Sequence, residues 1–124
     1  MYQKILVGTD GSKTAAKAVD RAVEVAASMD APLTILSAAR KDRGETIVAA
    51  EVARHAESGV AIDTVVVDDD PTAALVSTAE DGGYDLLVMG NRGMTGISRF
   101  FSLGAVPDKV SHRLPCTLLI VKTT

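Results

Sequence analysis

The chain has 124 residues, a formal net charge of −3 and a hydrophobic fraction of 47%, with aromatic residues at 3%. This length fits one domain, and the acidic balance without a basic stripe excludes a general nucleic-acid-binding surface. No apolar run reaches the roughly 20 residues that cross a bilayer, and we expect no secretory signal, because the first residues lead directly into a short apolar run. A single cysteine, Cys116, cannot form an internal disulfide, which is typical of a reducing compartment, so we expect a cytoplasmic protein. From the charge and the apolar runs we expect neither nucleic-acid nor membrane partners.

Segments in which apolar residues recur with the period of a strand alternate with segments in which they recur with the period of a helix. This alternation predicts strands that run parallel and are connected by crossover helices. The expected strands cover residues 4–10, 32–39, 61–68, 84–90 and 117–123. The expected helices cover residues 13–28, 45–58, 71–82 and 106–113. The unbroken apolar centre of the first strand, residues 5–7, is typical of a strand covered on both faces near the middle of a sheet.

Helix ends carry recognisable signals. Ser12 is placed to cap the first helix, and Asp70 followed by Pro71 predicts the start of the third. One face of the first helix is made of small apolar residues, Ala15, Val19, Ala22, Val23 and Ala26, and is expected to pack on the sheet. Residues 40–44 are expected to form a short connection before the second helix, with no room for a lid.

Two expected strand ends carry unusual residues. Gly8 to Ser12 follow the first strand, and Gly90, Gly93 and Gly104 surround the end of the fourth. Strand ends of an open parallel sheet form a crevice where the strand order reverses, and glycines let backbone amides approach a phosphate. Asp10 can accept a hydrogen bond from a base or a sugar, or help hold a cation. Turns and helix-end charge explain the same residues without a ligand.

Three segments of the sequence occur together in a specific order: KILVGTDGS at the start, YDLLVMGNRG at the fourth strand and GAVPDKVSHRLPCTLLIVK at the close. With these segments the sequence resembles the universal stress protein family nearly from end to end. It implies an α/β fold: a single doubly wound five-stranded parallel sheet of order 3-2-1-4-5 with helices on both faces, Rossmann-like. The reversal then falls between the first and fourth strands, where the crevice was expected.

The resemblance also implies binding of ATP or AMP, with Mg²⁺ as a companion of the phosphates. The family motif G-x2-G-x9-G-[ST] places Gly90 near the ribose, and Asp10 with the backbone of Gly8 and Ala38 at adenine or ribose. The full implied nucleotide site is Gly8, Thr9, Asp10, Ala38, Gly90, Arg92, Gly93, Gly104, Ala105 and Val106, with the last four lining the phosphates. Its function would be a regulatory role in the stress response.

The motif is altered in two respects. Ten residues separate Gly93 from Gly104 where the family has nine, and Ala105 replaces a hydroxyl residue. A hydrogen bond to a charged group contributes about 1.5–3 kcal/mol, so the triphosphate site is weakened unless Ser98 or Ser102 replaces the hydroxyl. The alternative function is therefore a dimeric interaction module of the same fold that does not bind nucleotide tightly.

Other chemistry is disfavoured by the sequence. The run Asp68 to Asp70 is better explained by a helix cap than by a phosphoacceptor site, because a paired acid after the first strand is missing. His55 and His112 are expected on exposed helix surfaces and form no triad. No catalytic residue is assigned, and without a general base beyond Asp10 at most slow ATP hydrolysis is expected. Met89, Met94, Phe100 and Phe101 are expected to serve packing.

The last strand predicts self-association. Residues 117–123 contain the apolar run LLIV and lie at a sheet edge in the expected order. An edge strand leaves backbone donors and acceptors unpaired, and a second copy pairing across a twofold axis would satisfy both edges. We therefore expect a homodimer through this strand.

Overall fold

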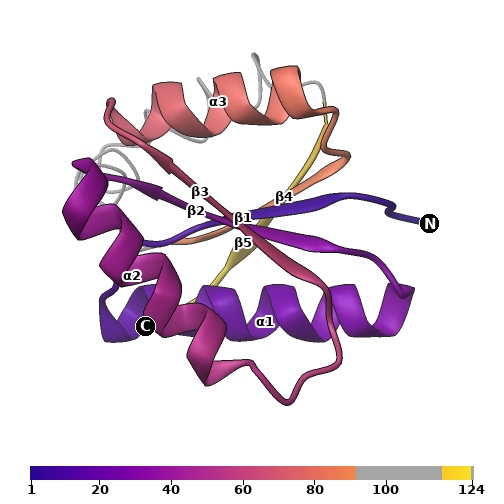
Figure 1. Ribbon diagram of the computed structural model, residues 1–124. Helices are drawn as coiled ribbons and strands as arrows, with labels where there is room; N and C mark the ends of the chain where they lie inside the picture. The colour runs from indigo at the N-terminus through magenta and orange to yellow at the C-terminus, as the bar shows by residue number, and fades with distance from the viewer. Residues whose placement is uncertain (92–115, 124) are drawn as a thin grey trace.

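The computed structural model of the protein describes residues 1–91 and 116–123 (Figure 1). The strands are β1 (Ile5–Gly8), β2 (Leu33–Ala38), β3 (Ile62–Val67), β4 (Leu86–Gly90) and β5 (Thr117–Val121). The helices within this part of the chain are α1 (Lys13–Met29), α2 (Lys41–Arg54) and α3 (Pro71–Gly82). None of these helices is both long enough and apolar enough to span a membrane.

The five strands form one sheet in the order β3-β2-β1-β4-β5, and every pairing is parallel. Strand β1 is central: Val7 lies opposite Ile35 of β2 on one side and Val88 of β4 on the other. Helices α1 and α2 cover one face and α3 covers the other (Figure 1). The predicted doubly wound architecture and its strand order are confirmed.

Two apolar clusters fill the space between the sheet and its helices. The cluster under α1 and α2 contains the predicted α1 face, with Ala22 and Ala26 fully buried against β1, β2 and β4 residues. The cluster under α3 contains Leu75, Tyr84 and Met89, so packing by Met89 is confirmed. Small alanines on α1 let the helix approach the sheet closely, which suits a core with few aromatic residues.

The predicted caps are confirmed by side-chain hydrogen bonds. Ser12 Oγ accepts from Ala15 N at 3.1 Å, and Asp70 Oδ2 accepts from Ala73 N at 3.2 Å. All five strands were predicted in the right places, yet each predicted strand extends one or two residues beyond the observed strand at one end or at both. The apolar pattern continues into flanking residues whose backbone no longer pairs, so the pattern alone overestimates strand length.

The predicted boundaries of the second helix were wrong. Helix α2 begins at Lys41 and ends at Arg54, four residues earlier at both ends than the predicted 45–58. Gly44 was interpreted as part of a loop, but it lies buried inside α2, where a Cβ atom would overlap the side chain of Val66. The glycine is there because α2 passes close to β3, so the connection from β2 to α2 is reduced to residues 39–40.

The amino end of β1 is tied to β4 by one carboxylate. Asp85 accepts from the amides of Gln3 at 2.8 Å and Lys4 at 2.9 Å, and its own amide donates to Lys4 O at 3.0 Å. Partial burial acts to raise the pKa of Asp85, but the amide hydrogen bonds outweigh it and lower the pKa below its ordinary value of 3.8. The ionised carboxylate thus bonds to residues 81 and 82 positions away in sequence and fastens the start of β1 (Ile5–Gly8) to the start of β4 (Leu86–Gly90).

Replacing Gly44 with alanine should lower the free energy of unfolding by about 1–2 kcal/mol, because overpacking against Val66 outweighs the higher helix propensity of alanine. Urea denaturation measures the change. The double substitution Gly44→Ala with Val66→Ala should show favourable coupling between the two sites, since the smaller side chain removes the overlap. Unchanged or increased stability in Gly44→Ala would contradict the placement of α2.

The substitution Asp85→Asn should lower the free energy of unfolding by about 1 kcal/mol at pH 7, because the neutral amide cannot accept both backbone bonds. Since the folded-state pKa is depressed, the stabilisation is present above 3.8 and is lost as the pH falls through the folded-state value. Wild type should therefore lose more stability than Asp85→Asn between pH 5 and pH 2 in urea titrations. Parallel pH profiles for the two proteins would refute this role.

Candidate functional site

Five of the predicted site residues lie together at the carboxyl edge of the sheet. Strand β2 ends at Ala38, β1 ends at Gly8 and leads into Thr9 and Asp10, and β4 ends at Gly90. These strands are neighbours in the sheet, so the five residues share one edge. The other predicted site residues, Arg92, Gly93, Gly104, Ala105 and Val106, lie outside the described residues, as does the predicted helix 106–113.

The backbone at the end of β2 faces this edge. Thr9 N donates to Leu36 O at 2.9 Å, which continues the pairing of β1 with β2 past the end of β1. Ala39 N donates in the opposite direction, to Val67 O of β3 at 3.0 Å. Because successive residues of a strand direct their amides to opposite neighbours, the main chain of Ala38 faces the β1 side, beyond Thr9.

The loop from β1 to α1 is shaped by its own side chains. Thr9 is fully buried and its Oγ1 accepts from Gly11 N at 3.1 Å. Asp10 Oδ1 accepts from Ser12 N at 2.9 Å, which fixes the half-buried carboxylate beside the start of α1. Gly11 has a φ of 84°, a left-handed conformation that favours glycine. The turn thus presents a carboxylate at the edge of the sheet, and a carboxylate can accept several hydrogen bonds.

A cavity of about 250 Å³ lies at this edge. Its lining includes two of the predicted residues, Asp10 and Ala38. Other lining residues come from the end of β2 (Ser37), from the start of α2 and the residue before it (Arg40, Arg43 and Ile47) and from the start of α3 (Pro71). We call this space the crevice. It combines a carboxylate, a hydroxyl group, two guanidinium groups and two apolar walls, a composition suited to a polar, charged small molecule.

The crevice side chains Ser37, Arg40 and Arg43 were not predicted as site residues. For Arg40 and Arg43 a signal was present in the sequence, because they belong to a cluster of basic residues that directly follows the second strand. That signal was missed because the second helix was expected to begin at residue 45, which left the arginines in a solvent-exposed loop. With α2 beginning at Lys41, both arginines are carried to the mouth of the crevice.

The end of β4 is anchored by Asn91. Its amide donates to Val121 O at 3.0 Å, and its side-chain Oδ1 accepts from both the amide and the hydroxyl of Thr123, at 2.9 and 3.0 Å. Lys17 of α1 adds a hydrogen bond from Nζ to Thr123 O at 3.2 Å. The chain that follows Gly90 therefore leaves the sheet from a fixed point.

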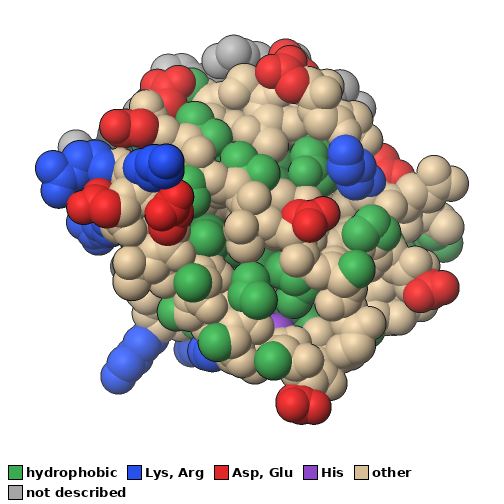
Figure 2. Space-filling model, in the orientation of Figure 1, with side chains coloured by type: hydrophobic (Ala, Val, Ile, Leu, Met, Phe, Trp, Pro, Cys, Tyr) green, Lys and Arg blue, Asp and Glu red, His purple; other side chains and the backbone are tan. Residues whose placement is uncertain are grey.

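A larger groove of about 700 Å³ lies between α2 and the edge strand β3 and contains none of the predicted site residues. It is lined by Val48, Val52 and Val66 among others, and Figure 2 shows hydrophobic side chains exposed over this face of the molecule. Polar and charged residues, Lys41, Glu45, Thr64 and Asp68, also line this groove, but no residue of β1 or β4 does. The predicted site residues follow those two strands and β2, so the candidate site is the crevice at the strand ends.

The remaining titratable residues form no competing site. Asp68, Asp69 and Asp70 are exposed, and Asp70 caps α3 as predicted. Within residues 1–91 and 116–123, no group of three or more histidine, cysteine or acidic residues could hold a metal ion. His55 was expected to be exposed, which was wrong: it is half-buried at the end of α2, with Nε2 3.0 Å from Asp20 Oδ1.

Comparisons with known proteins agree with this geometry. The model of the universal stress protein family matches residues 1–49 and 36–122 of the chain. Universal stress protein YxiE of Bacillus subtilis is 31% identical over 149 aligned positions that include 98% of this chain and 100% of that relative. Universal stress protein Rv1636 of Mycobacterium tuberculosis is 35% identical over 145 positions, with 99% and 98% of the two chains included.

Solved structures give the same result. A universal stress protein crystallised in complex with cAMP is 38% identical, superposes with a TM-score of 0.84, and is matched over 99% of this chain and 98% of its own. The crystal structure of protein Rv1636 is also 38% identical, with a TM-score of 0.69 and coverage of 99% and 97%.

Proposed function

Because the chain belongs to the universal stress protein family, we propose that it binds an adenine nucleotide in the crevice at the carboxyl ends of β1, β2 and β4. The observation that carries this proposal is the meeting of Asp10 and the Ala38 main chain at one cavity. The relative crystallised with cAMP supports the ligand class, since it is 38% identical over nearly the full length of both chains.

The chemistry of the crevice suits adenosine. Adenine presents an amino donor beside a ring nitrogen acceptor, and a strand end offers a matching carbonyl and amide, here those of Ala38. Asp10 can accept from a ribose hydroxyl or from the adenine amino group. Pro71 and Ile47 supply apolar walls for a flat base. A neutral purine and sugar therefore find both polar partners and apolar contacts.

The phosphates belong on the glycine side of the crevice. Gly90 ends β4 at the same edge, and the motif continues through Gly93 and Gly104, whose backbone amides would contact the phosphates together with Arg92, Ala105 and Val106. Ala105 supplies no hydroxyl group, so AMP should bind nearly as well as ATP. We assign the protein a regulatory role in the cytoplasmic stress response, in which the bound nucleotide alters its partners.

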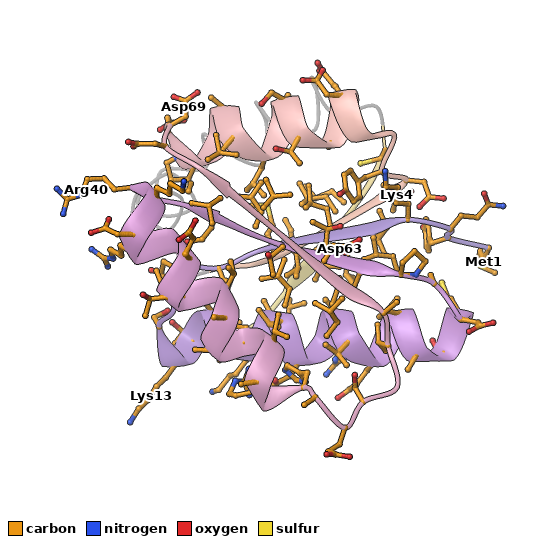
Figure 3. The ribbon with its side chains drawn as sticks, in the orientation of Figure 1. Met1, Lys4, Lys13, Arg40, Asp63 and Asp69 are labelled. Carbon is orange, nitrogen blue, oxygen red and sulfur yellow. The ribbon has the colours of Figure 1, made fainter. Side chains whose placement is uncertain are left out.

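Titration calorimetry with ATP, AMP and cAMP tests the proposal. The substitution Asp10→Asn keeps an oxygen that can accept from Ser12 N but removes the charge, and should weaken binding about tenfold or more. Asp63→Asn is the matched control, because Asp63 is exposed on the edge strand β3 (Figure 3) and should bind like wild type. Absence of binding by every nucleotide would favour the alternative, an interaction module that does not bind nucleotide.

We further propose that β5 forms a homodimer. In the described part of the chain β5 pairs with β4 alone, and Ile120 on this strand is 41% exposed. Besides Met1, it is the only large hydrophobic residue exposed among residues 1–91 and 116–123. An edge strand with an exposed apolar side chain is suited to pairing with a second copy.

The dimer is tested by light scattering at micromolar concentration. Wild type should show twice the chain mass, and Ile120→Lys should shift the mass to that of a monomer, because a charge buried at the interface has no partner. Thr64→Lys, on the exposed part of the opposite edge strand β3, should remain dimeric. A monomeric wild-type protein, or a dimer lost in Thr64→Lys alone, would overturn the proposal.

A further inference from the structure

Hydrogen-bond donors gather on the α2 side of the crevice. The first is Ser37, which is 1% exposed and lines the cavity together with Asp10. Its Oγ has no hydrogen-bond partner among residues 1–91 and 116–123. Buried hydroxyl groups almost always have a partner, so the unpaired hydroxyl of a residue that lines a cavity is a candidate hydrogen-bonding group for a ligand there.

Two arginines lie at the mouth of the same cavity. Neither Arg40 nor Arg43 takes part in the ion pairs found in the described part of the chain, which involve Arg21, Arg54 and His55 instead. Figure 3 shows the Arg40 side chain extending from the start of α2 toward solvent. Two arginines and one acidic residue, Asp10, thus contribute to the lining of the crevice.

The start of α2 adds to this positive field. Arg40 occupies the N-cap position and makes no side-chain capping bond, so no side-chain oxygen of the cap neutralises the positive end of this 14-residue helix. Asp42, in the first turn, accepts from Arg43 N at 2.8 Å and offsets part of the field. Guanidinium groups and helix amides only donate, so the cluster as a whole is matched to an anion.

We propose that Ser37, Arg40 and Arg43 form an anion subsite for a phosphate carried on the 2′ or 3′ oxygen of the ribose. The inference rests on the proposed function, in which Asp10 holds the sugar or the base, and Asp10 and Ser37 line one cavity. In doubly wound folds an arginine near the ribose is the group that accommodates a ribose phosphate. The 250 Å³ cavity is smaller than a typical whole-ligand pocket, so it would hold one end of the nucleotide.

The subsite depends on the short connection between β2 and α2. Residues 39–40 are the whole connection, and they bring Arg40 and Arg43 directly to the strand ends. Both arginines lie within three residues of the end of β2 at Ala38 or in the first turn of α2. The preference for a ribose phosphate is thus a property of this chain's own residues.

Titration calorimetry of the full chain with adenosine 5′-monophosphate, adenosine 2′,5′-bisphosphate and adenosine 3′,5′-bisphosphate tests the subsite. One of the bisphosphates should bind about tenfold or more tightly than the monophosphate, because charge-assisted hydrogen bonds add to the affinity. The ratio of bisphosphate to monophosphate affinity should fall below about threefold in Arg43→Gln and fall partly in Ser37→Ala. Ser37→Ala should fold normally, since it removes a buried hydroxyl that has no protein partner in the described residues.

Lys41→Gln is the matched control. Lys41 lies on the same turn of α2 and carries the same charge, but it lines the groove beside β3 instead of the crevice, so its substitution should leave the affinity ratio unchanged. Equal binding of monophosphate and bisphosphates by wild type would overturn the subsite and leave the proposed function standing. If Lys41→Gln lowered the ratio of bisphosphate to monophosphate affinity as much as Arg43→Gln does, the preference would come from general positive charge, and the subsite would be overturned. No binding by any of the three nucleotides would overturn both proposals.

Discussion

The parallel pairing of β1 with β2 on one side and β4 on the other is the constraint on which the rest of the structure depends. Val7 is held in register with Ile35 and Val88, and the side chains of all three are buried. A shift by one residue would move Val7 from the cluster under α1 and α2 into the cluster under α3, where Leu6 packs, so the fit of the side chains in the two clusters fixes the register. Because all strands run in the same direction, this register also brings Asp10, Ala38 and Gly90 to one edge.

The packing around the sheet determines what the edge can do. Gly44 lets α2 approach β3, and this approach sets α2 immediately behind the end of β2. The crevice therefore receives its charge from the first turn of a helix rather than from a long connection. On the other side of β1, Asn91 fastens the end of β4 to Val121 and Thr123.

Features recorded in local sequence patterns were predictable, and features set by contacts between distant segments were not. The buried run of β1 and the caps at Ser12 and Asp70 follow from patterns a few residues long, and these predictions are confirmed. The start of α2 was missed because Gly44 looks like a loop residue until its contact with Val66 is known. Ser37 was missed because its unpaired hydroxyl becomes evident only when burial and hydrogen bonds are known.

Hydrogen–deuterium exchange with and without saturating AMP tests the central claim most directly, because it reports which backbone segments a ligand protects. The account predicts slower exchange in residues 8–12 and 37–43, which border the crevice, with no change at the far end of α1 near Met29. Protection confined to the groove between α2 and β3, at residues 48–53 and 64–68, would contradict it, as would exchange that AMP leaves unaltered throughout the chain.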